Sequence, residues 1–149
     1  MQYHPVRSGY MKACRLTEGL LRQHGITRRP VAIERIIANY GIEIVERPLK
    51  LAPALFDRLT KTIYIRPMSE QRRRFYLGHE LGHYILPPDY HELSCNTFSA
   101  CLLMPHEWIL ADLRRASLTV LADWYKVTLP VLRIRLQQIG LKSRVKVPF

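Results

Sequence analysis

The sequence predicts an α+β fold in which a small antiparallel or mixed sheet packs on a helix that carries metal ligands. The chain has 149 residues, 48% of them hydrophobic, which is enough for one domain with a sizeable core. Most apolar residues recur with helical spacing, and only three short stretches alternate like strands. One helical stretch in the middle of the chain contains the pentapeptide His-Glu-Leu-Gly-His.

Two helices and three strands are predicted before this pentapeptide. Residues 11–24 form an amphipathic pattern that stops at Gly25. A second helix opens around Thr27 and Pro30 and ends before Gly41. The predicted strands are residues 42–46, 55–58 and 62–66.

The pentapeptide lies on a helix that is predicted to begin near Ser69 and to end at Leu86, because Pro87 cannot continue it. His79 and His83 are four residues apart, so their imidazoles face a common point on one side of the helix. Two neutral imidazoles placed in this way can chelate zinc.

Glu80 follows the first histidine, which turns its carboxylate about 100° around the helix axis. There it can reach a water beside the metal but is poorly placed to bind the metal together with His79 and His83. This arrangement is typical of a metal-assisted hydrolase with Glu80 as the general base. The pentapeptide also arises by chance, so its surroundings must decide.

A zinc site of this kind needs a third protein ligand. A turn after Leu86 can bring the start of the next helix back beside the metal, and Glu92 is the carboxylate best placed there. Asn96, one turn later on the same face, could accept the outer ring N–H of a ligating histidine. Asp89, His91 and Cys95 are competing candidates for the third ligand.

These residues resemble the ImmA/IrrE family of zinc metallopeptidases. The family pattern has an arginine and aromatic lead-in, H-E-L-G-H, a glutamate one turn before an asparagine, and a closing L-L-M-P. The matching residues here are 73–86, Glu92, Asn96, Phe98, Ala100 and 102–105. Gly78 replaces the usual alanine and Ser94-Cys95 the usual Glu-Ala, and neither change removes a presumed ligand. The resemblance runs from about residue 36 to residue 141.

The resemblance implies a zincin-like metallopeptidase fold, with residues 1–110 as the core and residues 111–149 as a basic helix-turn-helix-like segment in the same compact unit. It also implies one Zn²⁺ held by His79, His83 and Glu92, with Glu80 as the catalytic base. Family members typically cleave a helix-turn-helix transcriptional repressor and so release phage, mobile-element or stress-response genes. We therefore expect a protein substrate of that class.

Two further features of the cleft follow from zinc peptidases in general. Such enzymes grip an extended substrate at a sheet edge, and residues 62–66 are the candidate edge, although an internal strand paired on both sides is equally compatible with the pattern. A further donor usually steadies the oxyanion. The sequence does not choose among the candidate donors Tyr64, Tyr84, Tyr90 and His106.

The end of the chain is strongly basic. The whole sequence has 23 Lys and Arg against 12 Asp and Glu, a net charge of +11, which could attract nucleic acid or an acidic partner. The basic residues of this segment are Arg114, Arg115, Lys126, Arg133, Arg135, Lys142, Arg144 and Lys146.

Residues 117–136 form two short helices joined by Lys126-Val127-Thr128, which resembles a helix-turn-helix. The second helix opens with Leu129, Pro130 and Val131, which cannot read bases by hydrogen bonds. The pattern therefore favours packing or partner docking over sequence-specific DNA binding. The plain alternative for the arginines is a solvated basic face.

The alternative functions are a zinc-binding regulatory module without turnover and a DNA-binding protein with a structural zinc closed by four protein ligands. The intact Glu80 argues against the first.

No stretch is apolar enough for a membrane span, and no signal peptide is evident at residues 1–25, so we expect a cytoplasmic protein. Its three cysteines, Cys14, Cys95 and Cys101, are expected to be reduced and mostly buried.

Overall fold

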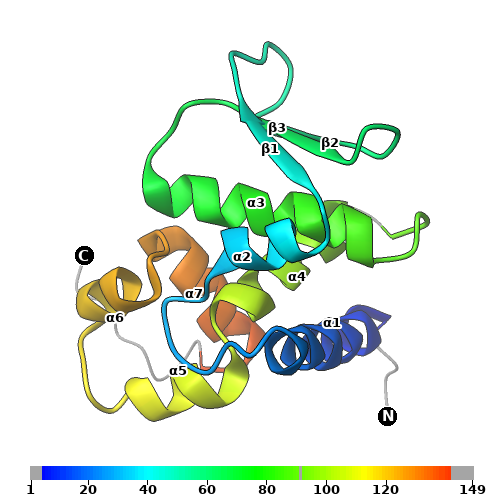
Figure 1. Ribbon diagram of the computed structural model, residues 1–149. Helices are drawn as coiled ribbons and strands as arrows, with labels where there is room; N and C mark the ends of the chain where they lie inside the picture. The colour runs from blue at the N-terminus through cyan, green and yellow to red at the C-terminus, as the bar shows by residue number, and fades with distance from the viewer. Residues whose placement is uncertain (1–4, 91, 142–149) are drawn as a thin grey trace.

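The computed structural model of the protein describes residues 5–90 and 92–141, and these residues form a mixed α+β structure. A small sheet lies on one side of the helix that bears the pentapeptide, and the other helices lie on its opposite side or around it (Figure 1). The elements are α1 (Pro5–Gln23), α2 (Ile33–Asn39), β1 (Glu43–Glu46), β2 (Ala54–Asp57), β3 (Thr62–Ile65), α3 (Glu70–Ile85), α4 (Glu92–Leu103), α5 (His106–Asp112), α6 (Leu118–Tyr125) and α7 (Leu129–Gln138).

The sheet is mixed, with strand order β1-β3-β2. β3 pairs in parallel with β1 and antiparallel with β2, so the prediction that residues 62–66 form an edge strand was wrong. Ile63 and Ile65 of β3 are fully buried, which fits a central strand that is paired with a neighbouring strand on each side. The edge strand that contacts α3 is β2.

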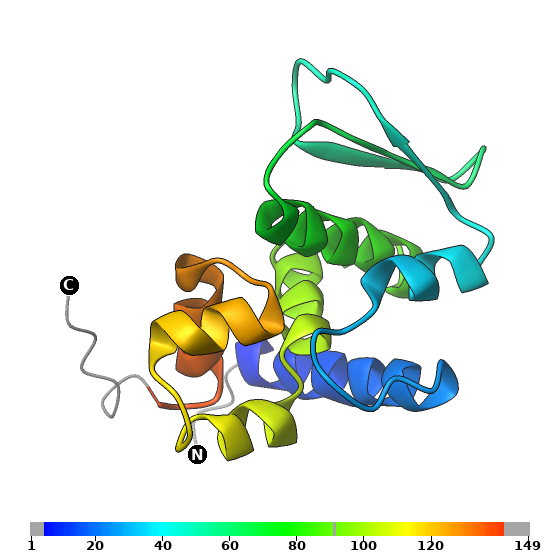
Figure 2. The same cartoon turned by 60° about the vertical axis from the view of Figure 1, so that its left-hand side comes forward.

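Helix α3 forms the middle layer, between the sheet and α4 (Figures 1 and 2). Its two glycines allow α4 to approach closely. A Cβ added at Gly78 would lie 3.3 Å from Cα of Ser99, and one added at Gly82 would lie 3.4 Å from Cα of Cys95. The Ser99 hydroxyl donates a hydrogen bond of 2.7 Å to the carbonyl of Phe75. The close packing of these two helices sets the geometry of the residues that they share at the site.

Helix α1 begins at Pro5 and not at residue 11, its predicted start. Most other element boundaries agree with the sequence prediction, and the clearest exception among them is α2. It begins at Ile33 and not at Thr27 or Pro30. The preceding Val31 is fully buried, and its carbonyl accepts a hydrogen bond of 2.8 Å from the guanidinium of Arg74. The residues before Ile33 are therefore held by contacts with α3 and not by helical hydrogen bonds.

Two arginines are buried and join distant parts of the chain. Arg74 of α3 also donates to the carbonyl of Lys126, in the turn between α6 and α7. Arg135 of α7 is 1% exposed and donates to the carbonyl of Met104 at 2.8 Å. Arg135 is one of the basic residues that were expected to attract nucleic acid or an acidic partner, but its guanidinium lies inside the protein and cannot contact either.

The helix-turn-helix-like segment is formed by α6 and α7, as predicted. Lys126 ends α6 in a left-handed conformation with φ 52°, and the Thr128 hydroxyl caps the first turn of α7. Lys142, Arg144 and Lys146, which were predicted to extend the basic segment, lie outside the described residues. Within residues 5–90 and 92–141, no helix is both long and apolar enough to cross a membrane.

Candidate metal centre

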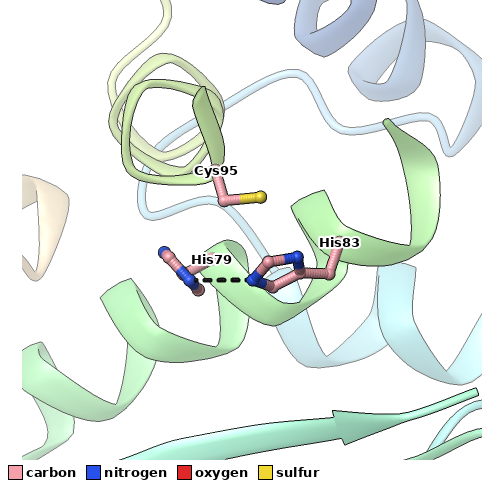
Figure 3. A group of neighbouring side chains, drawn as sticks. All are labelled: His79, His83 and Cys95. Carbon is pink, nitrogen blue, oxygen red and sulfur yellow. Dashed lines mark hydrogen bonds between the residues drawn. The ribbon is translucent and has the colours of Figure 1, made fainter. Parts of the chain in front are cut away.

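His79 and His83 lie on the face of α3 that meets α4, with their rings edge-on to each other at an interplanar angle of 72° (Figure 3). The two Nε2 atoms are 3.1 Å apart. His79 is 8% exposed, whereas His83 lies nearer the surface. Burial lowers the pKa of His83, which favours the neutral imidazole that a metal requires.

Glu92 lies in the first turn of α4 and brings its carboxylate to both histidines. One carboxylate oxygen is 2.7 Å from Nε2 of His79, and the other is 3.0 Å from Nε2 of His83. The Glu92 side chain is 73% exposed, so the open side of the cluster is toward solvent. The structure thus brings together the three residues predicted to hold a metal.

Asn96 lies one turn beyond Glu92 on α4. Its side-chain oxygen is 2.7 Å from Nδ1 of His79, on the side of the ring away from Glu92. Because a carbonyl oxygen only accepts, Nδ1 of His79 carries the proton in this contact. Nε2 of His79 is then left with a lone pair directed at the cluster.

This donor set fits a metal cation. The lone pair of His79 faces a carboxylate oxygen at 2.7 Å, and the two would repel each other without a proton or a cation between them. Zinc bonds of about 2.0–2.1 Å place the donors of a tetrahedral site about 3.3 Å apart, close to the 2.7–3.1 Å separations among the three residues here. Two imidazoles and one carboxylate are also ligand types that zinc accepts.

Comparisons with known proteins identify the family and the fold. Residues 37–137 match the IrrE N-terminal-like domain, peptidase family M78. The chain belongs to this family. A solved structure of a Mycobacterium tuberculosis transcriptional regulator is similar in fold, with a TM-score of 0.72 at 15% sequence identity. The similarity covers 96% of this chain but only 53% of the regulator, so the chain spans about half of that protein. No curated protein matches this sequence.

Membership of the M78 family implies a metal, and the structure offers a second possible ligand beside Glu92. Cys95 of α4 points toward the two histidines (Figure 3), and its sulfur lies within 4.8 Å of a ring nitrogen of each. Burial, together with the nearby Glu92 and Glu80 carboxylates, raises the pKa of Cys95 to about 12. A bound metal deprotonates a ligating thiol, so this pKa does not choose between Cys95 and Glu92. The carboxylate oxygens of Glu92, at 2.7 and 3.0 Å from the two Nε2 atoms, are in direct contact with both histidines.

Glu80 is buried beside the donor cluster of this M78 site. Burial raises the pKa of Glu80 to about 7, and the charge of Glu92 acts in the same direction. The charge interaction with His79 offsets part of this rise, and the backbone N–H of Phe56 in β2, which donates to the Glu80 carboxylate, offsets a smaller part. A carboxylate with a pKa near neutrality can both accept and return a proton.

Two contacts at the site had no signal in the sequence. The Phe56 backbone donor could not be found there, because any residue in that position supplies the same N–H. Arg58, just after β2, donates to the carbonyl of His83 and so joins the β2–β3 hairpin to the end of α3. An arginine in a turn is too common to be singled out, and only the fold reveals its partner.

The other candidates for the site are distributed as follows. Asp89 is exposed in the turn after α3, and His91 lies outside the described residues. Tyr84 packs edge-on against Phe56 and Tyr40, with centroid distances of 5.7 and 5.3 Å. The remaining oxyanion candidates are engaged elsewhere: Tyr64 under Arg47, Tyr90 beside Lys12, and His106 in a cavity between α1 and α5.

Proposed function

We propose that the chain is a zinc-dependent endopeptidase that cuts a peptide bond in a helix-turn-helix transcriptional repressor. The observation that carries the proposal is the convergence of His79, His83 and Glu92 within about 3 Å of one another, with the buried Glu80 beside them. Membership of the M78 peptidase family supports the same reaction class.

His79, His83 and Glu92 would hold the metal, and Asn96 would fix the ring of His79. When bound, zinc supplies a Lewis acid that polarises the scissile carbonyl and lowers the pKa of water. The three ligands leave room for substrate and water on the solvent side, where Glu92 is exposed.

Glu80 would act as the base and then as the acid. Its carboxylate takes a proton from the attacking water and passes that proton to the amine that leaves when the peptide bond breaks. The low-dielectric surroundings that raise the pKa of Glu80 to about 7 make the carboxylate a stronger base than an exposed glutamate. The Phe56 N–H would hold the carboxylate in place during both transfers.

The substrate would lie along β2. This strand is the edge of the sheet that contacts α3, and its Phe56 N–H already faces the catalytic helix. An extended peptide can add to such an edge through backbone hydrogen bonds, which bind a chain without demanding a particular sequence. Leu55 of β2 is 53% exposed and offers an apolar contact to a substrate side chain.

The proposed substrate class rests on the resemblance to the ImmA/IrrE family. The fold similarity to a protein described as a transcriptional regulator is compatible with a regulatory role. Cleavage of a repressor would release phage, mobile-element or stress-response genes. We further propose that residues 1–110 carry the peptidase site and that the segment after residue 111 docks protein partners more than it reads DNA.

The test is incubation of the zinc-loaded protein with the helix-turn-helix repressor encoded beside its gene. We expect one discrete cut, found by intact mass spectrometry and abolished by a chelator, and little digestion of unfolded casein. Broad digestion of casein, or an intact repressor after incubation with protein that holds one zinc per chain, would contradict the proposed substrate.

A second function is favoured by one observation, the nearness of Cys95 to the histidines. If Cys95 closed the metal site as a fourth protein ligand, the chain would be a zinc-containing regulatory or DNA-binding module without turnover. Loss of bound zinc from a Cys95→Ala variant would support that function. Retention of zinc would support the peptidase.

A further inference from the structure

A pair of cysteines lies away from the metal centre, between the first helix and α4. Sγ of Cys14 is 3.4 Å from Sγ of Cys101, although the two residues are 87 positions apart in the chain. Both thiols are free in the structure. Cys101 is 1% exposed, whereas Cys14 is partly exposed, so a small molecule in solvent reaches Cys14 first.

The buried Arg135 places a positive charge beside this pair. Its guanidinium donates to the Tyr10 hydroxyl at 2.8 Å and to the carbonyl of Met104 at 2.8 Å. Both of these acceptors are neutral, so neither cancels the charge. A guanidinium held in this way favours an anion at a neighbouring sulfur.

The two thiols are consequently unequal. The hydrogen bond from Cys101 lowers the pKa of Cys14 to about 6 against the opposing effect of burial, and Tyr10 and Arg135 act in the same direction as Cys101. The pKa of Cys101 is raised, first by its hydrogen bond to Cys14 and then by burial, while the charge of Arg135 partly opposes the rise. These opposite directions favour the thiolate on Cys14, with Cys101 as the donor of the hydrogen bond between them.

We propose that Cys14 and Cys101 form a peroxide-reactive pair, in which Cys14 is oxidised first and Cys101 then closes a disulfide between α1 and α4. The geometry that supports this is the 3.4 Å separation of the two sulfurs, the partial exposure of Cys14 and the buried cation beside them. A low-pKa, accessible thiolate next to a second thiol is the arrangement found in cysteines that oxidise reversibly.

The chemistry balances with hydrogen peroxide as the oxidant. The Cys14 thiolate attacks one peroxide oxygen, the O–O bond breaks, and the departing hydroxide takes a proton to give water and a sulfenic acid on Cys14. The Cys101 sulfur then attacks the sulfenic sulfur, and its proton leaves with the hydroxyl group as a second water. The two sulfurs together lose two electrons and the peroxide gains them.

The inference does not depend on the peptidase activity, because its readout is covalent mass. The folded, full-length protein is treated with about one equivalent of hydrogen peroxide, alkylated, and analysed intact and after proteolytic digestion without reduction. Before alkylation we expect a loss of about 2 Da, the mass of two hydrogens. After alkylation under denaturing conditions, the oxidised protein should lack the alkyl groups of Cys14 and Cys101, and digestion should give a crosslinked peptide that contains both residues. Cys95 in the same molecule is the internal control and should remain a free thiol.

Two variants separate the steps. Cys101→Ser should trap a sulfenic acid on Cys14, which dimedone labels, and should form no disulfide within the chain. Cys14→Ser should take up no dimedone at the same peroxide dose. In the wild type, alkylation of Cys14 should reach half its maximal rate near pH 6, and not near the value of about 8.5 of an ordinary cysteine. Two results would overturn the proposal. One is a half-maximal alkylation rate of Cys14 near pH 8.5, and the other is peroxide oxidation without a disulfide between Cys14 and Cys101.

Discussion

The side-chain oxygen of Asn96 lies 2.7 Å from Nδ1 of His79, while Nε2 of the same ring lies 2.7 Å from a carboxylate oxygen of Glu92. One imidazole therefore bridges two residues of α4 that are a single helical turn apart. This relationship fixes both the tautomer and the direction of the ring, and it depends on the close packing of α3 on α4.

The first prediction concerns this bridge. Asn96→Ala should leave the ligands in place but release the ring of His79, so zinc affinity should fall about 10-fold to 100-fold. Competition with a chromophoric chelator measures the change. Thr97→Ala is the matched control, because Thr97 is next on α4 and its hydroxyl bonds only locally, to the carbonyl of Leu93. Equal affinities for the two variants would contradict the role of Asn96.

The second prediction distinguishes Glu92 from Cys95. Glu92→Ala removes a donor that meets both histidines, so zinc should be lost during dialysis against a weak chelator. Cys95→Ala leaves His79, His83 and the Glu92 carboxylate between them in place, so the zinc content should stay near one per chain. Leu93→Ala, at a 77% exposed position in the same turn, controls for damage to the helix start. Loss of zinc from Cys95→Ala, with zinc retained by Glu92→Ala, would assign the third ligand to Cys95.

The third prediction concerns the contact between α3 and α4. A Cβ at Gly78 would lie 3.0 Å from Cβ of Ser99 and closer still to its hydroxyl oxygen. The Cα of Ser99, 3.3 Å away, leaves no room for the side chain to move aside. Gly78→Ala should therefore destabilise the fold by about 1–3 kcal/mol, as overpacking does. Gly19→Ala in α1 meets nothing within 4 Å and should stabilise by about 0.5–1 kcal/mol through helix propensity. Urea unfolding of both variants measures the difference, and a neutral Gly78→Ala would show that the two helices can separate without cost.

Much of the site was predictable because its signals are local. The spacing of His79 and His83, the position of Glu80 after the first histidine and the one-turn spacing of Glu92 and Asn96 are all properties of single helices. The family was also predictable from these residues, and residues 37–137 confirm it.

The errors concern relationships between segments that are distant in the sequence. Strand order depends on pairing across the sheet, so the alternation of residues 62–66 could not show that β3 is central. The charge of Arg135 suggested the surface, whereas its partners Met104 and Tyr10 come from other elements. The start of α2 was misplaced because the Arg74 hydrogen bond to Val31 is a tertiary contact that overrides a local start signal.

The fourth prediction concerns an ion pair between the buried Asp112 and the partly exposed Arg29, near the helix-turn-helix-like segment. Asp112 accepts hydrogen bonds of 2.7 Å from both Arg29 and the Tyr125 hydroxyl. Burial opposes ionisation of Asp112, but these bonds and the charge of Arg29 together lower its pKa below the ordinary value of 3.8. Asp112→Asn should destabilise the protein by about 1–3 kcal/mol at pH 7, because it removes the charge from the hydrogen bonds with Arg29 and Tyr125 while Arg29 keeps contact with solvent.

The sign of the pH dependence follows from the lowered pKa. The contribution of the Asp112 carboxylate is fully present above pH 3.8, the unfolded value, and is lost as the pH falls through the lower, folded value. The stability gap between wild type and Asp112→Asn should therefore be constant from pH 7 to pH 5 and close only below about pH 4. Asp123→Asn, at an exposed ion pair with Lys126, should change stability by less than about 1 kcal/mol. A gap that closes between pH 7 and pH 5 would contradict the assignment to Asp112.

The fifth prediction concerns Glu80, which is near the metal ligands but is not expected to bind the metal. Glu80→Gln keeps the shape of the side chain and removes the base, so it should retain zinc and lose at least about 100-fold in cleavage rate. His79→Ala should lose both zinc and cleavage, because it removes a ligand.

The most direct measurement is zinc content and repressor cleavage in the same preparations of wild type and Glu80→Gln. The account predicts one zinc per chain in both proteins and a discrete cut made only by the wild type. Equal cleavage by both would contradict the role of Glu80 as the base. Absence of zinc from the wild type, purified without chelators, would contradict the metal centre of His79, His83 and Glu92 itself.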